Sequence, residues 1–284
     1  MPVSWPNTLV REIAERRAIL FVGSGVTKSA LPTLPNWPDL LSELAERVDK
    51  KKDVALVKSL IRRDRLLDAA ELINSLLSPV ERRAIFENKF LFTPPPQAEI
   101  YRYLLDLDFK VCITTNYDQF LEKNFEYHSG GAIAYQVRTY KYDNFLADLR
   151  SPSRTILKLH GCITDPSSII LDRQPYFKAK ANNPGIYDIV EALSTVNTVL
   201  FFGYSINDPD IQLILERIHA RSRTDHPHYA LVSKFEHPSL RKALNETFNV
   251  SFVEYPKGIH QEFPEAVKEL RDAVKAERAR FGIP

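Results

Sequence analysis

The sequence predicts an α/β fold, a parallel sheet with an inserted helical lobe, from three observations. First, short apolar runs stop abruptly at glycine or polar residues, and the residues that follow them include Gly23, Asn116, His160 and Gly203. Second, apolar runs and helical periodicity alternate from Phe109 onward, which is typical of parallel strands joined by helices. Third, the stretch before that point has helical periodicity without a strand signal.

The first elements follow from these patterns in chain order. The apolar run Ala18–Val22 predicts a buried strand. The next helical face starts at Trp37, and Asn36 and Pro38 are signals for a helix start. Helical periodicity then continues from Val54 to Leu105, and this block forms the expected lobe.

From Phe109 the strand and helix signals alternate. The remaining strands are expected at Phe109–Thr114, Ala134–Arg138, Thr155–His160, Thr198–Gly203, His228–Val232 and Val250–Glu254. The helices are expected at Tyr117–Glu126, Ile186–Ser194, Pro209–Ala220, Ser239–Thr247 and along the apolar stripe from Phe263 to Val274. We expect one domain over residues 1–284, with the helical insertion at about residues 38–106.

Composition and charge are those of an ordinary globular protein. Of the 284 residues, 44% are hydrophobic and 26% charged, and the net charge of +2 requires neither nucleic acid nor an anionic membrane as a partner. The clusters Lys50–Lys52 and Arg62–Arg65 are interpreted as solvated helical faces, so direct nucleic-acid binding is not expected. No apolar run reaches the ~20 residues of a membrane helix. No secretory signal is recognised at the N-terminus, and we expect a cytoplasmic protein.

The two cysteines restrict the metal chemistry that the chain can support. Cys112 and Cys162 both lie in strand-like runs, where a small buried side chain is the usual interpretation. Such cysteines suit a reducing compartment. Two thiols cannot make a four-cysteine zinc site, and no metal is expected.

A glycine turn, Gly23–Gly25, follows the first strand and leads into a helix start at Val26–Thr27. Small residues let backbone N–H groups approach a phosphate, and a helix start favours negative charge. The turn departs from the dinucleotide-binding fingerprint because Lys28 occupies the third glycine position, and it lacks the ending of a P-loop. On its own, it fits phosphate binding and an ordinary tight turn equally well.

Polar residues with chemical potential follow two later strands. Asn116 either caps the next helix or contacts a ligand, and Asp118 either caps that helix or orients a catalytic network. His160 is either a satisfied core residue or a general base. Ligands of open parallel sheets bind where the carboxyl ends of strands converge. An Asn and a His at adjacent strand ends, facing a phosphate-binding turn, suit activation of a ribose hydroxyl or of water.

Taken in order, these motifs resemble those of sirtuin-like domains. The matching segments are Gly23-Ser24-Gly25-Val26-Thr27, Thr115-Asn116-Tyr117-Asp118, Lys158-Leu159-His160-Gly161, Gly203-Tyr204-Ser205 and Asp208-Pro209-Asp210. More closely, the chain resembles the bacterial sirtuin-like NAD hydrolase domains of antiphage defence systems, which lack zinc. The resemblance spans roughly Ala18 to Tyr255.

The resemblance implies a Rossmann-like sheet that binds NAD as a substrate, with a smaller helical lobe beside it. It implies that Asn116 and Asp118 flank the nicotinamide ribose and that His160 is the catalytic base. The NAD-binding residues that it implies are Gly23, Ser24, Gly25 and Thr27 around the diphosphate and nearby ribose, Trp37 in the loop over nicotinamide, and Gly203 and Ser205 on the adenosine side.

One departure from the protein-deacylating sirtuins decides the expected reaction. Those enzymes carry a zinc module with two pairs of cysteines after the His strand, whereas this chain has Cys162 there and no other. Water is therefore the expected acceptor of the ADP-ribosyl group, which makes the chain an NAD glycohydrolase that depletes NAD in antiphage defence. The alternatives are an NAD-dependent protein deacylase and a non-catalytic sensor that binds NAD or ADP-ribose.

An active NAD hydrolase would harm its own cell, so restraint of the activity is expected. The resemblance implies control by homo-oligomerisation or by a partner, in several systems a ring-shaped P-loop ATPase of the DNA-translocase type encoded nearby. The chain contains no P-loop motif of its own.

Overall fold

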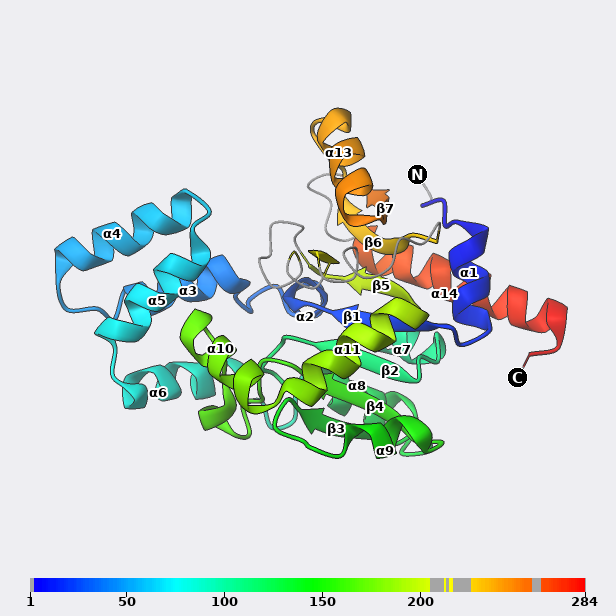
Figure 1. Cartoon of the computed structure of the whole chain (residues 1–284), viewed down its shortest axis with the longest axis horizontal. Helices are drawn as coiled ribbons and strands as arrows, with labels where there is room; N and C mark the ends of the chain where they lie inside the picture. The colour runs from blue at the N-terminus through cyan, green and yellow to red at the C-terminus, as the bar shows by residue number, and fades with distance from the viewer. Residues whose placement is uncertain (1–2, 205–211, 213–214, 217–225, 257–261, 284) are drawn as a thin grey trace.

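Seven strands form one sheet in which every neighbouring pair is parallel (Figure 1). The structure is a computed structural model that describes residues 3–204, 212, 215–216, 226–256 and 262–283. The strands are β1 (Ala18–Val22), β2 (Val111–Thr114), β3 (Tyr135–Thr139), β4 (Arg154–Lys158), β5 (Thr198–Phe202), β6 (His228–Ser233) and β7 (Val250–Tyr255). All seven match strands expected from the sequence, and the central strands β1, β2 and β5 are continuous apolar segments because they are fully buried.

The order of the strands is β3-β4-β2-β1-β5-β6-β7. The chain fills one side of the sheet with β2 to β4 and the other side with β5 to β7, so the direction reverses between β1 and β5. Ligands of such sheets bind outside the carboxyl ends of the strands at this switch. The Rossmann-like fold class is therefore confirmed, and the topology already locates the site.

Helices cover both faces of the sheet. On one face lie α1 (Asn7–Ala14), α7 (Glu99–Asp106), α8 (Phe120–His128) and α14 (Glu262–Phe281). On the other lie α9 (Phe145–Arg150), α10 (Arg173–Asn182), α11 (Pro184–Val196) and α13 (Pro238–Phe248). Side chains of β1 alternate between the two cores, with Leu20 and Val22 in the first and Ile19 and Phe21 in the second.

The helical lobe lies beside the sheet, next to α2 (Ser24–Ala30) (Figure 1). It contains α3 (Trp37–Ala45), α4 (Lys51–Arg62), α5 (Leu66–Leu76) and α6 (Pro79–Phe90). The predicted start of α3 is confirmed, because Asn36 and Asp39 bind each other's backbone N–H groups in a capping box. Buried lobe residues such as Leu41 and Ile73 belong to the same core cluster as α1 and α14. The single domain over residues 1–284, with an insertion at about 38–106, stays a prediction.

The structure corrects the sequence-based boundaries near the site. Strand β4 ends at Lys158, so His160 and Cys162 lie beyond it, and Cys162 forms only an isolated bridge with Asp165. Helix α8 starts at Phe120, because the preceding residues form a loop. The sequence patterns missed α1, α9 and α10.

Part of the expected structure lies outside the described residues. This applies to Ser205, to the segment 208–210 and to most of the expected helix Pro209–Ala220. Among the helices that are described, none has the length and apolar character needed to cross a membrane.

Candidate active site

A cavity of about 430 Å³ lies against the carboxyl ends of the central strands. Six of the residues proposed for catalysis or NAD binding line it, namely Ser24, Thr27, Trp37, Asn116, Asp118 and His160. They come from separate segments of the chain, after β1, β2 and β4 and at the start of α3. The lobe contributes Leu40, Leu67 and Phe90 to the same cavity, and α10 contributes Arg173, Tyr176 and Phe177.

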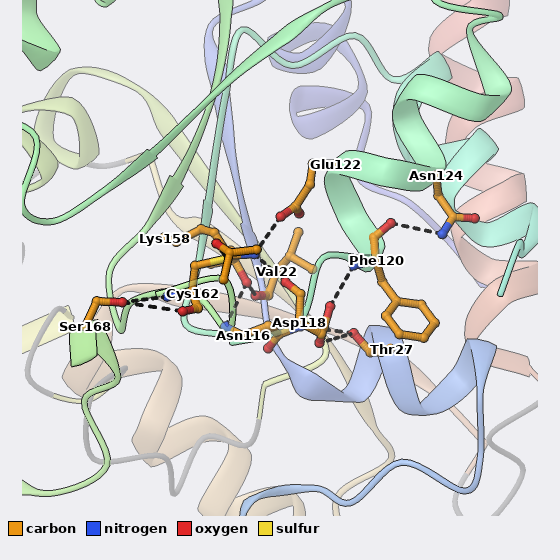
Figure 2. A network of polar contacts seen from close by, with 12 residues as sticks. Val22, Thr27, Asn116, Asp118, Phe120, Glu122, Asn124, Lys158, Cys162 and Ser168 are labelled. Carbon is orange, nitrogen blue, oxygen red and sulfur yellow. Dashed lines mark hydrogen bonds and ion pairs between the residues drawn. The ribbon is translucent and has the colours of Figure 1, made fainter. Parts of the chain in front are cut away.

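Asn116 lies in the loop between β2 and α8 and faces Thr27 on α2 (Figure 2). Its side-chain amide donates a hydrogen bond to Thr27 Oγ1 at 3.1 Å, and its backbone N–H donates to Thr114 Oγ1 at 3.0 Å. Helix α8 has Gln119 at its N-cap and no side-chain cap there. The interpretation of Asn116 as a cap of that helix is therefore wrong, and its amide belongs to the wall of the cavity.

Asp118 is only 5% exposed, and its carboxyl contacts both the start of α8 and Thr27. Its Oδ1 accepts from the N–H of Phe120, the first residue of α8, at 2.9 Å. Its Oδ2 accepts from Thr27 Oγ1 at 3.3 Å (Figure 2). Burial raises the pKa of the Asp118 carboxyl above its ordinary value, although the nearby Lys158 cation lowers it. Thr27 thus connects the carboxyl of Asp118 to the amide of Asn116.

His160 lines the cavity two residues beyond the end of β4 and is 8% exposed. Its ring lies 6.4 Å from the ring of Tyr176 on α10, in an edge-to-face arrangement. The turn after His160 requires glycine, since Gly161 has a φ of +84° and a Cβ there would lie 2.2 Å from the carbonyl oxygen of Ser168. The histidine is therefore held at the cavity wall by a turn that tolerates no side chain at the next position.

The glycines after β1 and β5 bring two strand ends into backbone contact. Gly23 N–H donates to Phe202 O at 2.8 Å, and Gly25 N–H donates to Gly203 O at 2.9 Å. Gly203 has a φ of +72°, and a Cβ there would lie 2.5 Å from Val26 N. These contacts explain the glycines structurally, so the assignment of Gly23, Gly25 and Gly203 to NAD stays a prediction.

Three further residues of the cavity wall were not selected from the sequence. Tyr204 Oη donates to Val22 O at 3.0 Å and accepts from the N–H of Thr115, which ties β1 to β2. Asp172 is 2% exposed and caps α10, and burial raises the pKa of its carboxyl. Arg173 forms ion pairs with α5. Only the Asp172 cap carries a local sequence signal, because acidic residues are common at that position.

The described part of the chain holds no group of three or more His, Cys, Asp or Glu side chains that could bind a metal ion. Cys112 and Cys162 are both buried and not in a disulfide. The candidate site therefore consists of an amide, a histidine, a buried carboxyl and hydroxyl groups, arranged at the strand ends next to the topological switch.

This combination of a parallel sheet and strand-end residues agrees with a family comparison. A model of the SIR2-like domain matches residues 110–253, about half of the chain. The chain belongs to the SIR2-like domain family.

Relatives with assigned names match over most of this chain. The NAD(+) hydrolase ThsA of Bacillus cereus is 24% identical over 80% of this chain and 45% of its own length. The protein of the same name from Cytobacillus dafuensis is 28% identical over 79% of this chain and 43% of its own. Defense-associated sirtuin 2 of Bacillus subtilis is 24% identical over 72% of this chain and 20% of its own. The chain thus spans less than half the length of these curated relatives.

Among solved structures, a SIR2 homologue in complex with NAD covers 96% of both chains at 16% identity, with a TM-score of 0.43. At that score the likeness adds nothing to the topology described above.

Proposed function

We propose that this chain is an NAD glycohydrolase, which converts NAD and water to nicotinamide and ADP-ribose. The observation that carries the proposal is a single cavity lined by Asn116, Asp118 and His160 at the strand ends next to the topological switch. The family and the relatives named NAD(+) hydrolase support the same chemistry. The cysteine count is too low for the zinc module of a deacylase.

In the proposed reaction, the bond between ribose C1′ and the nicotinamide nitrogen breaks, and the electron pair leaves with nicotinamide. The oxygen of water adds to C1′. Asn116 holds the ribose and positions the water, and His160 accepts the proton released by water or by a ribose hydroxyl. A general base of this kind contributes about 10²- to 10⁴-fold to the rate. Asp118 orients Asn116 through Thr27, whose hydroxyl donates to the carboxyl of Asp118 and accepts from the amide of Asn116.

For NAD binding, we propose Ser24 and Thr27 near the diphosphate and its ribose and Trp37 over nicotinamide. These three side chains line the same cavity as the catalytic pair. Gly203 and Ser205 are proposed for the adenosine side, while Gly23 and Gly25 shape the turn that leads into α2. NAD acts here as the substrate, and no metal takes part.

We further propose that the activity depletes NAD in the cytoplasm during antiphage defence. The name of the Bacillus subtilis relative supports a role in defence. Restraint is proposed to come from homo-oligomerisation or from a partner such as a ring-shaped P-loop ATPase, and direct nucleic-acid binding has no part in it. The mass of the purified chain, measured alone and with the product of a neighbouring gene, tests the assembly.

The decisive experiment follows nicotinamide and ADP-ribose by chromatography after the purified protein is mixed with NAD. The unmodified chain is expected to release both, while Asn116→Ala and His160→Ala lose at least ~100-fold in rate and still bind NAD by calorimetry. His237→Ala, which changes an exposed histidine at the start of α13, is the control and keeps full activity. Turnover by His160→Ala at the unmodified rate contradicts the mechanism.

The two alternatives predict different products in the same experiment. A protein deacylase releases nicotinamide only when an acylated peptide is added. A sensor binds NAD or ADP-ribose without releasing nicotinamide under any of these conditions. No binding of either NAD or ADP-ribose by the unmodified chain would reject all three functions for this cavity.

A further inference from the structure

A buried lysine ends β4 behind the cavity. Lys158 is 1% exposed and does not line the cavity wall. Its ammonium group donates to the main-chain carbonyl of Asp118 and, at 3.0 Å, to Glu122 Oε1 on α8 (Figure 2). Lysine is almost never fully buried unless it is paired. Its position therefore calls for an explanation.

Stability alone is a poor explanation for this ion pair. Taking two charges out of water has a large desolvation cost, and apolar residues of similar volume often replace a buried pair without loss of stability. Among the described residues, Glu122 Oε2 has no hydrogen-bond partner, so the pair is not fully satisfied. Burial lowers the pKa of Lys158, but Glu122, Cys162 and Asp118 together raise it by more, and the net pKa lies above its ordinary value. The group therefore stays charged at neutral pH.

What Lys158 holds is the loop that carries Asn116. Two successive carbonyls of this loop are bound from the β4 side. Tyr117 O accepts from the N–H of Ile163 at 2.9 Å, and Asp118 O accepts from Lys158. The same strand end leads, two residues later, to His160.

We propose that Lys158 is a positioning residue that fixes the Asn116 loop relative to the strand end that presents His160. It touches neither substrate nor product. Its ammonium group binds a backbone carbonyl of the loop, so the spacing of the catalytic pair depends on this bond. This inference rests on the proposed NAD glycohydrolase function, because the reaction needs Asn116 and His160 in register. Small displacements of positioned groups reduce turnover far more than they reduce binding.

The test separates the two bonds of Lys158 by substitution. Lys158→Met removes both, and we expect kcat to fall on the order of tenfold to a hundredfold with a smaller change in KM. Glu122→Gln removes the ion pair but leaves the hydrogen bond from Lys158 to Asp118 O in place. We expect this variant to have a lower unfolding midpoint and a kcat within about twofold of that of the unmodified chain. The double variant Lys158→Met with Glu122→Met removes the buried charges together. We expect it to regain the unfolding midpoint but not kcat.

A matched control comes from the same helix. Lys123 pairs with Glu126 on α8 at the same 3.0 Å, but both side chains are exposed. Lys123→Met is expected to leave kcat, KM and the unfolding midpoint unchanged. A fall in kcat equal to that of Lys158→Met would trace the effect to net charge and overturn the inference.

A second readout does not depend on turnover. Hydrogen exchange of the backbone amides in residues 115–120 is expected to be faster in the double variant than in the unmodified chain, while exchange in β1 stays the same. Recovery of kcat together with stability in the double variant, or unchanged exchange in this loop, overturns the role of Lys158. If the unmodified chain releases no nicotinamide either alone or with its partner, the proposed function fails, and the exchange measurement alone decides whether Lys158 holds the loop.

Discussion

The two walls of the cavity are held in place by different forces. On the sheet wall, short buried hydrogen bonds join the strand ends, such as Gly25 N–H to Gly203 O at 2.9 Å and Thr114 Oγ1 to Val22 O at 2.6 Å. On the lobe side, apolar packing is supplemented at α10 by two ion pairs of Arg173 with α5. The Arg173 side chain is 37% exposed.

This difference indicates that the two walls have different functions in the site. Asn116, Asp118 and His160, the side chains suited to chemistry, all belong to the wall fixed by buried bonds, where a group is positioned within a narrow range. The lobe contributes mainly apolar surface, and its link to α10 is screened by water and salt. Segments attached in this way open at a lower free-energy cost than the core. The lobe side is therefore the side expected to move when substrate enters.

The largest effect on stability is expected at the backbone contact between the ends of β1 and β5 on the sheet wall. Gly203→Ala places a Cβ 2.5 Å from Val26 N at a φ of +72°. Strain at such a φ and overpacking of a tight contact each cost about 1–3 kcal/mol. We expect the free energy of unfolding, measured by urea denaturation, to fall by about 3 kcal/mol or more, with loss of NAD binding.

Gly185→Ala is the matched control for this substitution. Gly185 lies in the first turn of α11, and a Cβ there meets nothing within 4 Å. Alanine also favours the helix by about 0.5–1 kcal/mol, so this variant is expected to equal or exceed the unmodified chain in stability. Equal losses from the two variants would show that the glycine contact is not what holds this wall.

An intermediate effect on stability is expected from the buried carboxyl of Asp118. Because burial raises the pKa of Asp118 in the folded protein, the folded state binds the proton more tightly than the unfolded chain does. The stability that this carboxyl contributes is thus present below the unfolded pKa of about 3.9 and is lost as the pH rises through the folded pKa. Asp118→Asn removes this loss. Its stability relative to the unmodified chain is expected to be higher at pH 8 than at pH 4, measured by thermal unfolding.

Asp165→Asn provides a control of opposite sign. Hydrogen bonds from Ser167 and from Lys141 lower the pKa of Asp165, so its contribution is present above the unfolded pKa and is lost as the pH falls. Removing the Asp165 carboxyl is expected to lower the stability, relative to the unmodified chain, at pH 8 and not at low pH. The same sign for both variants would mean that Lys158 outweighs burial at Asp118.

The sequence predicts the sheet wall better than the wall formed by the lobe and α10. The central strands β1, β2 and β5 are buried apolar runs. The polar residues that follow the strands, Asn116 and His160 among them, can be read directly because strand ends converge in a parallel sheet. Helix α10 gave no such signal, since Ala179 is its one buried residue and no apolar stripe marks it. Tyr176 and Arg173 were therefore missed with the helix that carries them.

Long-range partners are the second limit of the sequence-based predictions. The Gly23–Gly25 turn was recognised as a place of close approach, but nothing local indicates that its N–H groups bind the backbone after β5. The strand expected at Thr155–His160 likewise does not indicate that the ammonium group of Lys158 binds a carbonyl 40 positions earlier. Such contacts depend on the order of strands in the sheet.

The smallest effect is expected at the attachment of α10 to the lobe. Arg173→Ala removes the contacts of its guanidinium with Asp68 at 2.7 Å and with Glu71 at 3.1 Å. Partly exposed pairs contribute about 0.2–1 kcal/mol and weaken with salt. The free energy of unfolding is therefore expected to change by less than about 1 kcal/mol, while KM for NAD shifts at low salt and the shift disappears at high salt.

Arg65→Ala separates attachment from local charge, because Arg65 also pairs with Asp68 at 2.5 Å but within the lobe itself. Losing that pair leaves the link between α5 and α10 intact, so no salt-dependent shift in KM is expected. A shift in both variants would assign the effect to the field around Asp68. A shift in Arg173→Ala alone would show that α10 and the lobe are coupled through this side chain, and that substrate entry depends on the weaker wall.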